Sequence, residues 1–377
     1  MRARLTRFAA LLLALTLAAC AAQHQHEAAT TPVLVQADGS YPRQPLEKDS
    51  VVVKVVQHGV KNLQDFDTVA EGLEVNLGRM VEFARRACSE GAKPDFILFN
   101  EFPLTGYSSG SRDEKLRFTI EIPGPETDRL GEIARECDSY IIFGSYARDA
   151  DWPGHILSIN AVIDRSGRVA KKYWKTRNVK RLNADGEIPT TTIEGVRDRY
   201  REMYGVEEEF PVLQTEFGNI AVSTVQLDPF VFAAYAMRGV EIMFRTSTLF
   251  STSDVRATAF FNRFYSAMSN ITFPPGEYAR YGGGSLIVGP RGQILAQDET
   301  NNESVIEAEI PIAEFREGRT IPRFPLEVVA PVFEQYQQEV PMNHLDLPAN
   351  QLPQTRPAMK QLLDDSSRWL NAQDGDN

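Results

Sequence analysis

Short apolar runs alternate with amphipathic stretches between residues 51 and 310, and this alternation constrains the fold more than any other feature. The runs at residues 51–56 and 96–99 are apolar at nearly every position, which is typical of strands buried on both faces. Apolar residues recur at helical spacing from Val69 to Ala87, which predicts an amphipathic helix that ends near Gly91. The pattern therefore predicts an α/β fold built in layers.

The same alternation continues along the chain. Further strands are expected at residues 140–146, 156–164, 168–174, 219–226, 240–245, 285–289, 294–297 and 304–310. Further helices are expected at residues 126–137 and 255–269, with a short one before residue 240. The turns Arg165-Ser166-Gly167 and Pro290-Arg291-Gly292 predict hairpins, which argue against a purely parallel sheet.

The N-terminal segment differs from this body. Arg2, Arg4 and Arg7 precede an apolar run over residues 8–19 that is too short to span a bilayer as a helix. The run ends in Leu17-Ala18-Ala19-Cys20, which resembles the lipobox of bacterial lipoproteins. The resemblance implies that residues 1–19 are a signal peptide and that Cys20 is lipidated and anchors the chain to the membrane. An ordinary signal peptide with a chance cysteine is the alternative.

The expected location is the bacterial cell envelope. The two residues after Cys20 are alanines, without the aspartate that often retains lipoproteins in the inner membrane, so an outer-membrane anchor facing the periplasm is favoured. Residues 20–49 are predicted to be the lipidated cysteine and a flexible tether, and residues 50–320 a single domain. Residues 321–377 are predicted to be a C-terminal helix and tail, with the helix at residues 358–370.

Charge and metal-ligand spacing exclude several classes of function. The chain has 40 Lys and Arg against 51 Asp and Glu, which argues against nucleic acid as the main partner. No two of the three cysteines have CxxC spacing, and no two of the five histidines have metal-ligand spacing. No metal or other cofactor is therefore expected.

Several segments together resemble one enzyme superfamily. An acidic residue, Glu101, follows a buried strand and precedes Leu104-Thr-Gly-Tyr107, and Lys175 ends a strand two residues after a tyrosine. These motifs, with residues 218–228 and 282–285, resemble the nitrilase or carbon–nitrogen hydrolase superfamily, in particular its aliphatic amidase and formamidase branch. The resemblance implies a four-layer α-β-β-α sandwich with its site at the strand ends, and a homodimer is possible.

The resemblance also implies roles for three charged residues. Members of the superfamily hydrolyse amides or nitriles through a covalent thioester or thioimidate. Glu101 matches the general base and Lys175 the cation that stabilises the oxyanion. A second glutamate of the amidase branch matches Glu194 in Ile193-Glu194-Gly195, although it lies farther from Lys175 than in the family, and Glu187 is the competing position.

The nucleophile is where this sequence departs from the family. Gln226 stands where the family has cysteine, and a shift of one residue places Val225 there instead. Neither side chain can attack a carbonyl. Ser223 and Thr224 are close in sequence, but neither occupies the expected turn.

The remaining cysteines do not replace the nucleophile. Cys88 and Cys137 lie on helices that are expected to cover the outside of the sandwich. An oxidising compartment allows a disulfide between them, but the sequence does not fix their distance, and two free buried thiols are the favoured state.

Three functions are compatible with these features. The first is a lipid-anchored protein of the nitrilase fold without normal amidase activity, which uses its site to bind a small amide, amine or carboxylate, or binds a protein partner. The second is an active amide hydrolase in which Glu101 and Lys175 act with water or a nucleophile other than cysteine. The third is a structural lipoprotein with a vestigial pocket. The missing nucleophile and the retained charges favour the first.

Overall fold

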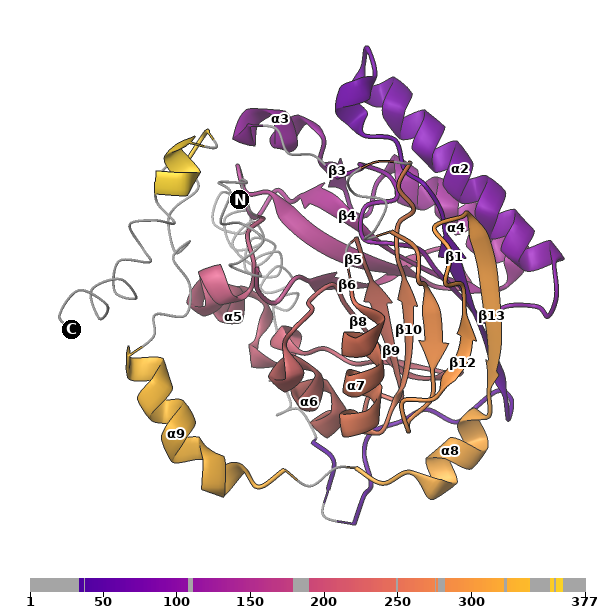
Figure 1. Cartoon of the computed structure of the whole chain (residues 1–377), viewed down its shortest axis with the longest axis vertical. Coiled ribbons are helices and arrows are strands. Elements are labelled where there is room, and N and C mark those ends of the chain that lie inside the picture. Colours follow the sequence, from indigo (N-terminus) through magenta and orange to yellow (C-terminus); the bar gives the residue numbers. More distant parts are fainter. Residues whose placement is uncertain are drawn as a thin grey trace, which may run out of the picture. The chain divides into compact units, whose positions relative to one another are not determined.

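Two mixed β-sheets form the centre of the chain (Figure 1). The computed structural model describes residues 34–36, 38–107, 111–178, 190–248, 250–274, 276, 282–321, 324–339, 353–355 and 357–361. All of these lie in one compact unit, Val33–Asn377. Cys20, Glu187 and residues 362–370 of the predicted C-terminal helix lie outside the described residues.

The first sheet has strand order β13-β1-β2-β4-β5-β6, with β3 paired to β4. Its strands are β1 (Val51–Gln57), β2 (Phe96–Leu98), β3 (Ile120–Glu121), β4 (Tyr140–Arg148), β5 (Leu157–Ile163), β6 (Val169–Trp174) and β13 (Ser304–Ile310). β1, β2 and β4 are parallel, whereas β5, β6 and β13 pair antiparallel to their neighbours. The predicted hairpin between β5 and β6 is confirmed, with Gly167 at a positive φ in its turn.

The second sheet has strand order β12-β11-β10-β9-β8-β7. Its strands are β7 (Leu213–Thr215), β8 (Gly218–Ser223), β9 (Ile242–Thr246), β10 (Tyr265–Ser269), β11 (Leu286–Val288) and β12 (Ile294–Gln297). The three central strands β8, β9 and β10 are parallel, so their carboxyl ends meet at one edge of the sheet.

Helices complete the four layers. Leu77 and Met80 of α2 (Val69–Ser89) and Leu130 of α4 (Pro125–Cys137) pack with Ile97 and Ile141 of the first sheet. Between the sheets, the rings of Phe96 and Phe244 lie 5.2 Å apart in a core of buried aliphatic residues. Buried residues of α6 (Pro229–Met237) and α7 (Thr252–Asn262) pack in the same hydrophobic cluster as the strands of the second sheet. The predicted α-β-β-α sandwich is confirmed.

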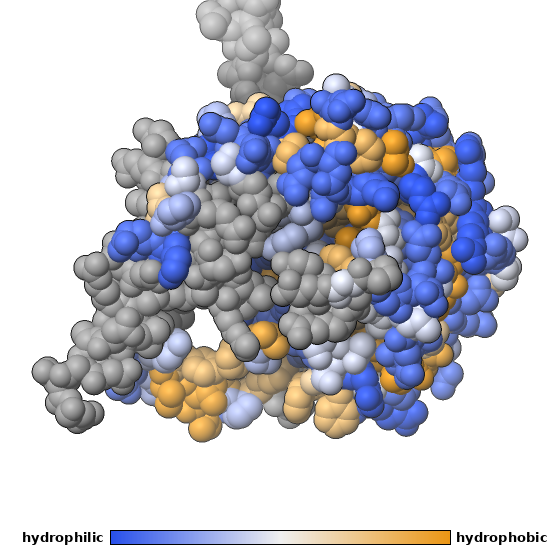
Figure 2. Space-filling model, turned by 45° about the horizontal axis from the view of Figure 1, so that its top comes forward, coloured by the Kyte–Doolittle hydropathy of each residue, from blue (hydrophilic) through white to orange (hydrophobic). Residues whose placement is uncertain are grey.

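The remaining helices are short or peripheral. They are α3 (Arg112–Arg117), α5 (Arg197–Tyr204), α8 (Ile312–Gly318), α9 (Leu326–Glu339) and the 3₁₀ turns Leu63–Asp65, Glu194–Val196 and Val206–Glu209. α9 was not predicted from the sequence, and apolar side chains gather over it at the lower left of Figure 2. Among the described residues, no helix has the length and hydropathy required to cross a bilayer.

Two expected elements were wrong in extent. The single helix predicted at residues 255–269 is α7 followed by β10, because Arg263 adopts a left-handed conformation and ends the helix. The strand predicted at residues 219–226 ends at Ser223, whose hydroxyl accepts a hydrogen bond from the Val225 N–H at 3.2 Å. The chain then turns toward α6.

The expectation of two free thiols was also wrong. Cys88 of α2 and Cys137 of α4 form a disulfide, with their Cα atoms 5.7 Å apart. The two helices lie side by side on the first sheet and bring the cysteines within the distance that a disulfide bridges.

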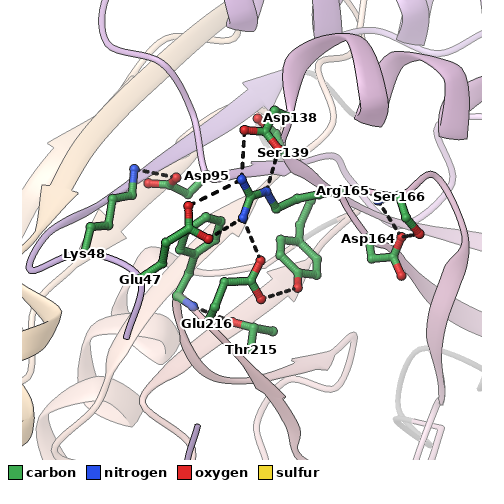
Figure 3. Close-up of polar contacts among 12 residues, drawn as sticks. Glu47, Lys48, Asp95, Asp138, Ser139, Asp164, Arg165, Ser166, Thr215 and Glu216 are labelled. Atoms are coloured by element: carbon green, nitrogen blue, oxygen red, sulfur yellow. Dashed lines mark hydrogen bonds and ion pairs between the residues drawn. The ribbon is translucent and has the colours of Figure 1, made fainter. Parts of the chain in front are cut away.

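Part of the predicted tether contacts the folded unit. Arg165, in the turn between β5 and β6, donates hydrogen bonds to Asp138, Glu47 and Glu216, which come from three separate segments (Figure 3). This guanidinium and Lys93 hold the pKa of Asp138 well below its usual range. The charge cluster joins residue 47, before the first strand, to both sheets.

Candidate functional site

Glu101 and Lys175 lie together at the ends of two strands of the first sheet. Glu101 follows β2 and Lys175 directly follows β6, and the Lys175 Nζ lies 3.3 Å from the Glu101 Oε1. The side chain of Glu101 is 7% exposed and that of Lys175 is 18% exposed. The other carboxylate oxygen of Glu101 accepts a hydrogen bond from the Thr248 hydroxyl at 2.8 Å. The structure thus brings together the two charged residues that the sequence singled out.

The backbone fixes both residues from neighbouring strands. The Glu101 N–H donates to the Ser247 carbonyl of the second sheet at 3.3 Å, and the Lys175 N–H donates to the Ser158 carbonyl at 3.0 Å. Gly144 of β4 lies directly against Glu101, since a Cβ at position 144 would be 2.4 Å from the Glu101 carbonyl oxygen. Only glycine allows this close approach.

Asn160 of β5 lies opposite Gly144 of β4, the glycine against which Glu101 packs. Its Oδ1 accepts a hydrogen bond from the Thr246 hydroxyl at 2.6 Å, which joins the two sheets next to the charged pair. Its Nδ2 is buried and has no hydrogen-bond partner among the described residues.

A sharp turn connects β8 to α6 where the superfamily carries its nucleophile. Leu227 has a φ of 56°, an uncommon conformation for a residue other than glycine. Asp228 then caps α6, because its carboxylate accepts a hydrogen bond from the Val231 N–H. The strand, turn and helix expected from the sequence are present.

Buried charges hold the backbone of this turn. The Arg245 guanidinium is fully buried beside the Phe232 ring, and its Nη2 donates to the Val225 carbonyl at 2.8 Å and to Asp254 at 2.6 Å. Asp254 in turn accepts from the Leu227 N–H at 3.3 Å. Burial lowers the pKa of Arg245, and Asp254 opposes this shift.

Neither position 225 nor position 226 carries a nucleophilic side chain. Gln226 is 8% exposed, and among the described residues its side chain makes no hydrogen bond to Glu101 or Lys175. Val225 is fully buried. The buried hydroxyl of Thr224 has no partner among the described residues.

The segment after Lys175 meets the turn after Gln226. The Arg177 guanidinium forms an ion pair with Asp228 and donates to the Leu227 carbonyl. The Ile193 N–H donates to the Lys175 carbonyl, and the Glu194 N–H donates to the Thr176 carbonyl at 2.9 Å. Glu194 therefore lies next to the segment that carries Lys175. The choice between Glu194 and Glu187 stays a prediction, because Glu187 lies outside the described residues.

Sequence reasoning missed Thr248 and Arg177. The hydroxyl-rich run Thr246-Ser247-Thr248, at the end of a buried strand, is the signal that points to Thr248. Arg177 could be found only from its contact across the turn. Among the described residues, no group of three His, Cys, Asp or Glu side chains could hold a metal ion.

The geometry defines what the site can do chemically. The Glu101 carboxylate can accept a proton, and the Lys175 ammonium can stabilise negative charge on a ligand oxygen. Within the described part of the chain, these groups suit a small polar ligand but lack a thiol for covalent chemistry.

Comparison with known proteins gives a consistent result. The carbon-nitrogen hydrolase family model matches residues 54–320. The chain is 26% identical over 262 residues to an omega-amidase of Xenopus tropicalis, which covers 66% of this chain and 88% of that protein. It is 25% identical over 280 residues to a bifunctional nitrilase/nitrile hydratase of Lupinus angustifolius, which covers 62% of this chain and 72% of that protein.

Solved structures show the same fold. A cysteine-to-alanine mutant of an amidase of the nitrilase superfamily from Nesterenkonia AN1 aligns with a TM-score of 0.52 at 19% identity, and the alignment covers 77% of this chain and 99% of that one. The NitFhit protein of C. elegans aligns with a TM-score of 0.55 at 18% identity, covering 77% of this chain and 65% of that one.

Proposed function

The chain belongs to the carbon–nitrogen hydrolase family, and we propose that it is a lipid-anchored member that binds a small amide, amine or carboxylate at Glu101 and Lys175 without hydrolysing it through a cysteine. Its relatives include amidases and nitrilases, whose chemistry begins with attack on carbon. This chain retains groups that recognise and polarise such a ligand.

One observation carries the proposal. The 3.3 Å contact between Glu101 and Lys175 is formed in a chain whose residues at the expected nucleophile position, 225 or 226, are valine and glutamine. The two cysteines within residues 50–320, Cys88 and Cys137, form a disulfide between helices α2 and α4. These observations support the proposal that the charges of a hydrolase site are kept without its cysteine nucleophile.

The proposed envelope location has two supports. The sequence around Cys20 resembles a lipobox, and the Cys88–Cys137 disulfide suits an oxidising compartment. Metabolic labelling with an alkyne fatty acid tests the anchor: the wild-type chain is expected to be labelled and to sediment with membranes, whereas Cys20→Ser is expected to be unlabelled and soluble. Labelling that persists in Cys20→Ser contradicts the anchor.

Ligand binding and turnover are measured on the full chain carrying Cys20→Ser. We expect acetamide to bind in calorimetry without release of ammonia, and Glu101→Gln to abolish binding. Glu121→Gln is the matched control, because Glu121 is an exposed glutamate paired with Arg148. Wild-type ammonia release that survives Gln226→Ala and disappears in Glu101→Gln would contradict the proposal and favour a hydrolase that uses water or a hydroxyl.

A restored thiol tests the rest of the site. A solved structure of a glutamate-to-glutamine mutant of the Nesterenkonia amidase shows covalent addition of the acetamide moiety of fluoroacetamide at its active-site cysteine. We expect Gln226→Cys, but not Val225→Cys, to gain this adduct in intact-mass measurements, with fluoride released. An adduct on Val225→Cys alone indicates that position 225, and not position 226, corresponds to the cysteine of the family. No adduct on either variant means that the charged pair does not face the turn.

A further inference from the structure

A pocket of about 630 Å³ is lined by residues close in sequence to the candidate site, although neither Glu101 nor Lys175 lines it. Two of its walls are Thr176 and Arg177, which follow Lys175, and Leu227 and Asp228, which follow Gln226. A third wall includes Glu194. The pocket is therefore lined by the residues that directly follow Lys175 and Gln226 in the chain.

The remaining lining residues are the ion-paired Arg197 and Glu209 and a set of mainly apolar side chains. The apolar and aromatic members of this set are Ile193, Phe210, Pro229, Phe230, Val231 and Tyr336. Phe230 of α6 is 62% exposed, and its ring packs against Phe333 of α9 at 4.9 Å. Tyr336 of the same helix is also 62% exposed. Among the described residues, large aromatic side chains thus line an exposed part of the pocket.

The charges in the pocket are paired with one another. Arg177 forms an ion pair with Asp228, and Glu209 accepts from both Arg197 and Arg201 at 2.7 Å. Each of these charged groups is balanced within the chain, so a charged ligand group entering the pocket would have to displace an existing ion pair. An uncharged, apolar group meets no such cost.

Leu227 adds to this surface from the turn. Its side chain is 58% exposed although its backbone is held in the left-handed region, where glycine or asparagine is the usual residue. A large apolar side chain at a strained and exposed position gains nothing for the free fold. Contact with a bound apolar group would compensate for both costs.

We propose that this pocket is a subsite for an uncharged apolar substituent, an alkyl chain or an aromatic ring, on the ligand whose amide or carboxyl end lies at Glu101 and Lys175. The inference rests on the proposed function and assigns the ligand class: amides extended by an apolar group, in preference to short ones. Burial of this group would give the affinity, and the charged pair would give the orientation.

The test uses acetamide, hexanamide and 3-phenylpropionamide with the full chain carrying Cys20→Ser. We expect the affinity measured by calorimetry to rise at least about tenfold from acetamide to 3-phenylpropionamide, since each buried methylene contributes a factor of about four. Phe230→Ala and Tyr336→Ala should remove most of this gain and leave acetamide unchanged. Phe261→Ala is the matched control, because Phe261 is 64% exposed but does not line the pocket.

The outcomes separate the two proposals. Equal affinity for the three amides, all lost in Glu101→Gln, overturns the subsite and leaves the proposed function standing. Equal losses for Phe230→Ala and Phe261→Ala also overturn it. Absence of binding for every amide overturns both. Thermal unfolding of each variant confirms that the fold is intact, and Phe230 and Tyr336, both largely exposed, give two independent variants.

Discussion

Removal of the Cys88–Cys137 disulfide should destabilise the chain by a predictable amount. The two cysteines are 49 residues apart, and the chain-entropy relation gives about 4 kcal/mol for a closed loop of that length. This is a large part of the stability of a typical domain, about 5–15 kcal/mol. We therefore expect Cys88→Ala/Cys137→Ala to unfold at a markedly lower urea concentration than the wild type.

The neighbouring contacts between the same helices provide the control. The ion pair of Arg85 in α2 with Glu136 in α4 is about half exposed on both sides, and such pairs contribute about 1 kcal/mol or less. Arg85→Ala should therefore shift the urea midpoint far less than loss of the disulfide.

Reduction gives an independent measurement of the same quantity. Dithiothreitol should lower the wild-type midpoint to that of Cys88→Ala/Cys137→Ala and should leave that variant unchanged. A double variant within about 1 kcal/mol of the oxidised wild type would refute the reasoning, because the loop entropy would then not govern the stability. Two titratable thiols in the unreduced chain would refute the pairing itself.

Three further predictions concern the interior and the site. Burial lowers the pKa of His58 to about 4 from 6.5, so the unfolded chain binds a proton that the native chain excludes. The free energy of unfolding should therefore fall by about 3 kcal/mol as the pH falls from 6.5 to about 4. In urea titrations, the free energy of unfolding of His58→Gln should not show this decrease. Thr248→Val removes a hydrogen bond to the Glu101 carboxylate and should lower the urea-unfolding free energy by about 1–3 kcal/mol, and Thr248→Ser should restore it. Glu101→Leu should cost about 3–5 kcal/mol by the same measurement, whereas Glu101→Leu/Lys175→Met should cost much less, because no unpaired charge remains.

The sequence predicted the layers well because most elements have a clear period. The long helix α2 and the strands β1, β4 and β13 lie within a few residues of the predicted bounds. The failures occurred where a single residue overrides the pattern. The left-handed conformation of Arg263 separates a helix from a strand, and both carry apolar residues. The spacing of apolar residues therefore does not reveal the boundary.

The candidate site was predictable only in part, for the same physical reason. Glu101 follows the buried strand β2 and Lys175 follows the edge strand β6, so their meeting at one edge follows from the topology. Thr248 and Arg177 act through contacts between segments far apart in sequence, and such contacts leave no local signal. The disulfide was missed because the sequence placed both cysteines on helices without fixing the distance between those helices.

The contacts around the turn are compatible with a residue other than cysteine at position 226, the proposed nucleophile position. The turn is held through its backbone, by Arg245 on the Val225 carbonyl and by the Asp228 cap, and these contacts do not depend on the side chain at position 226. Replacement of a cysteine there costs the fold little. Loss of Glu101 alone would instead leave Lys175 without its partner, so one substitution at a time cannot remove the pair cheaply. Retention of the pair is therefore evidence for ligand binding only if the double substitution leaves the fold stable and abolishes binding.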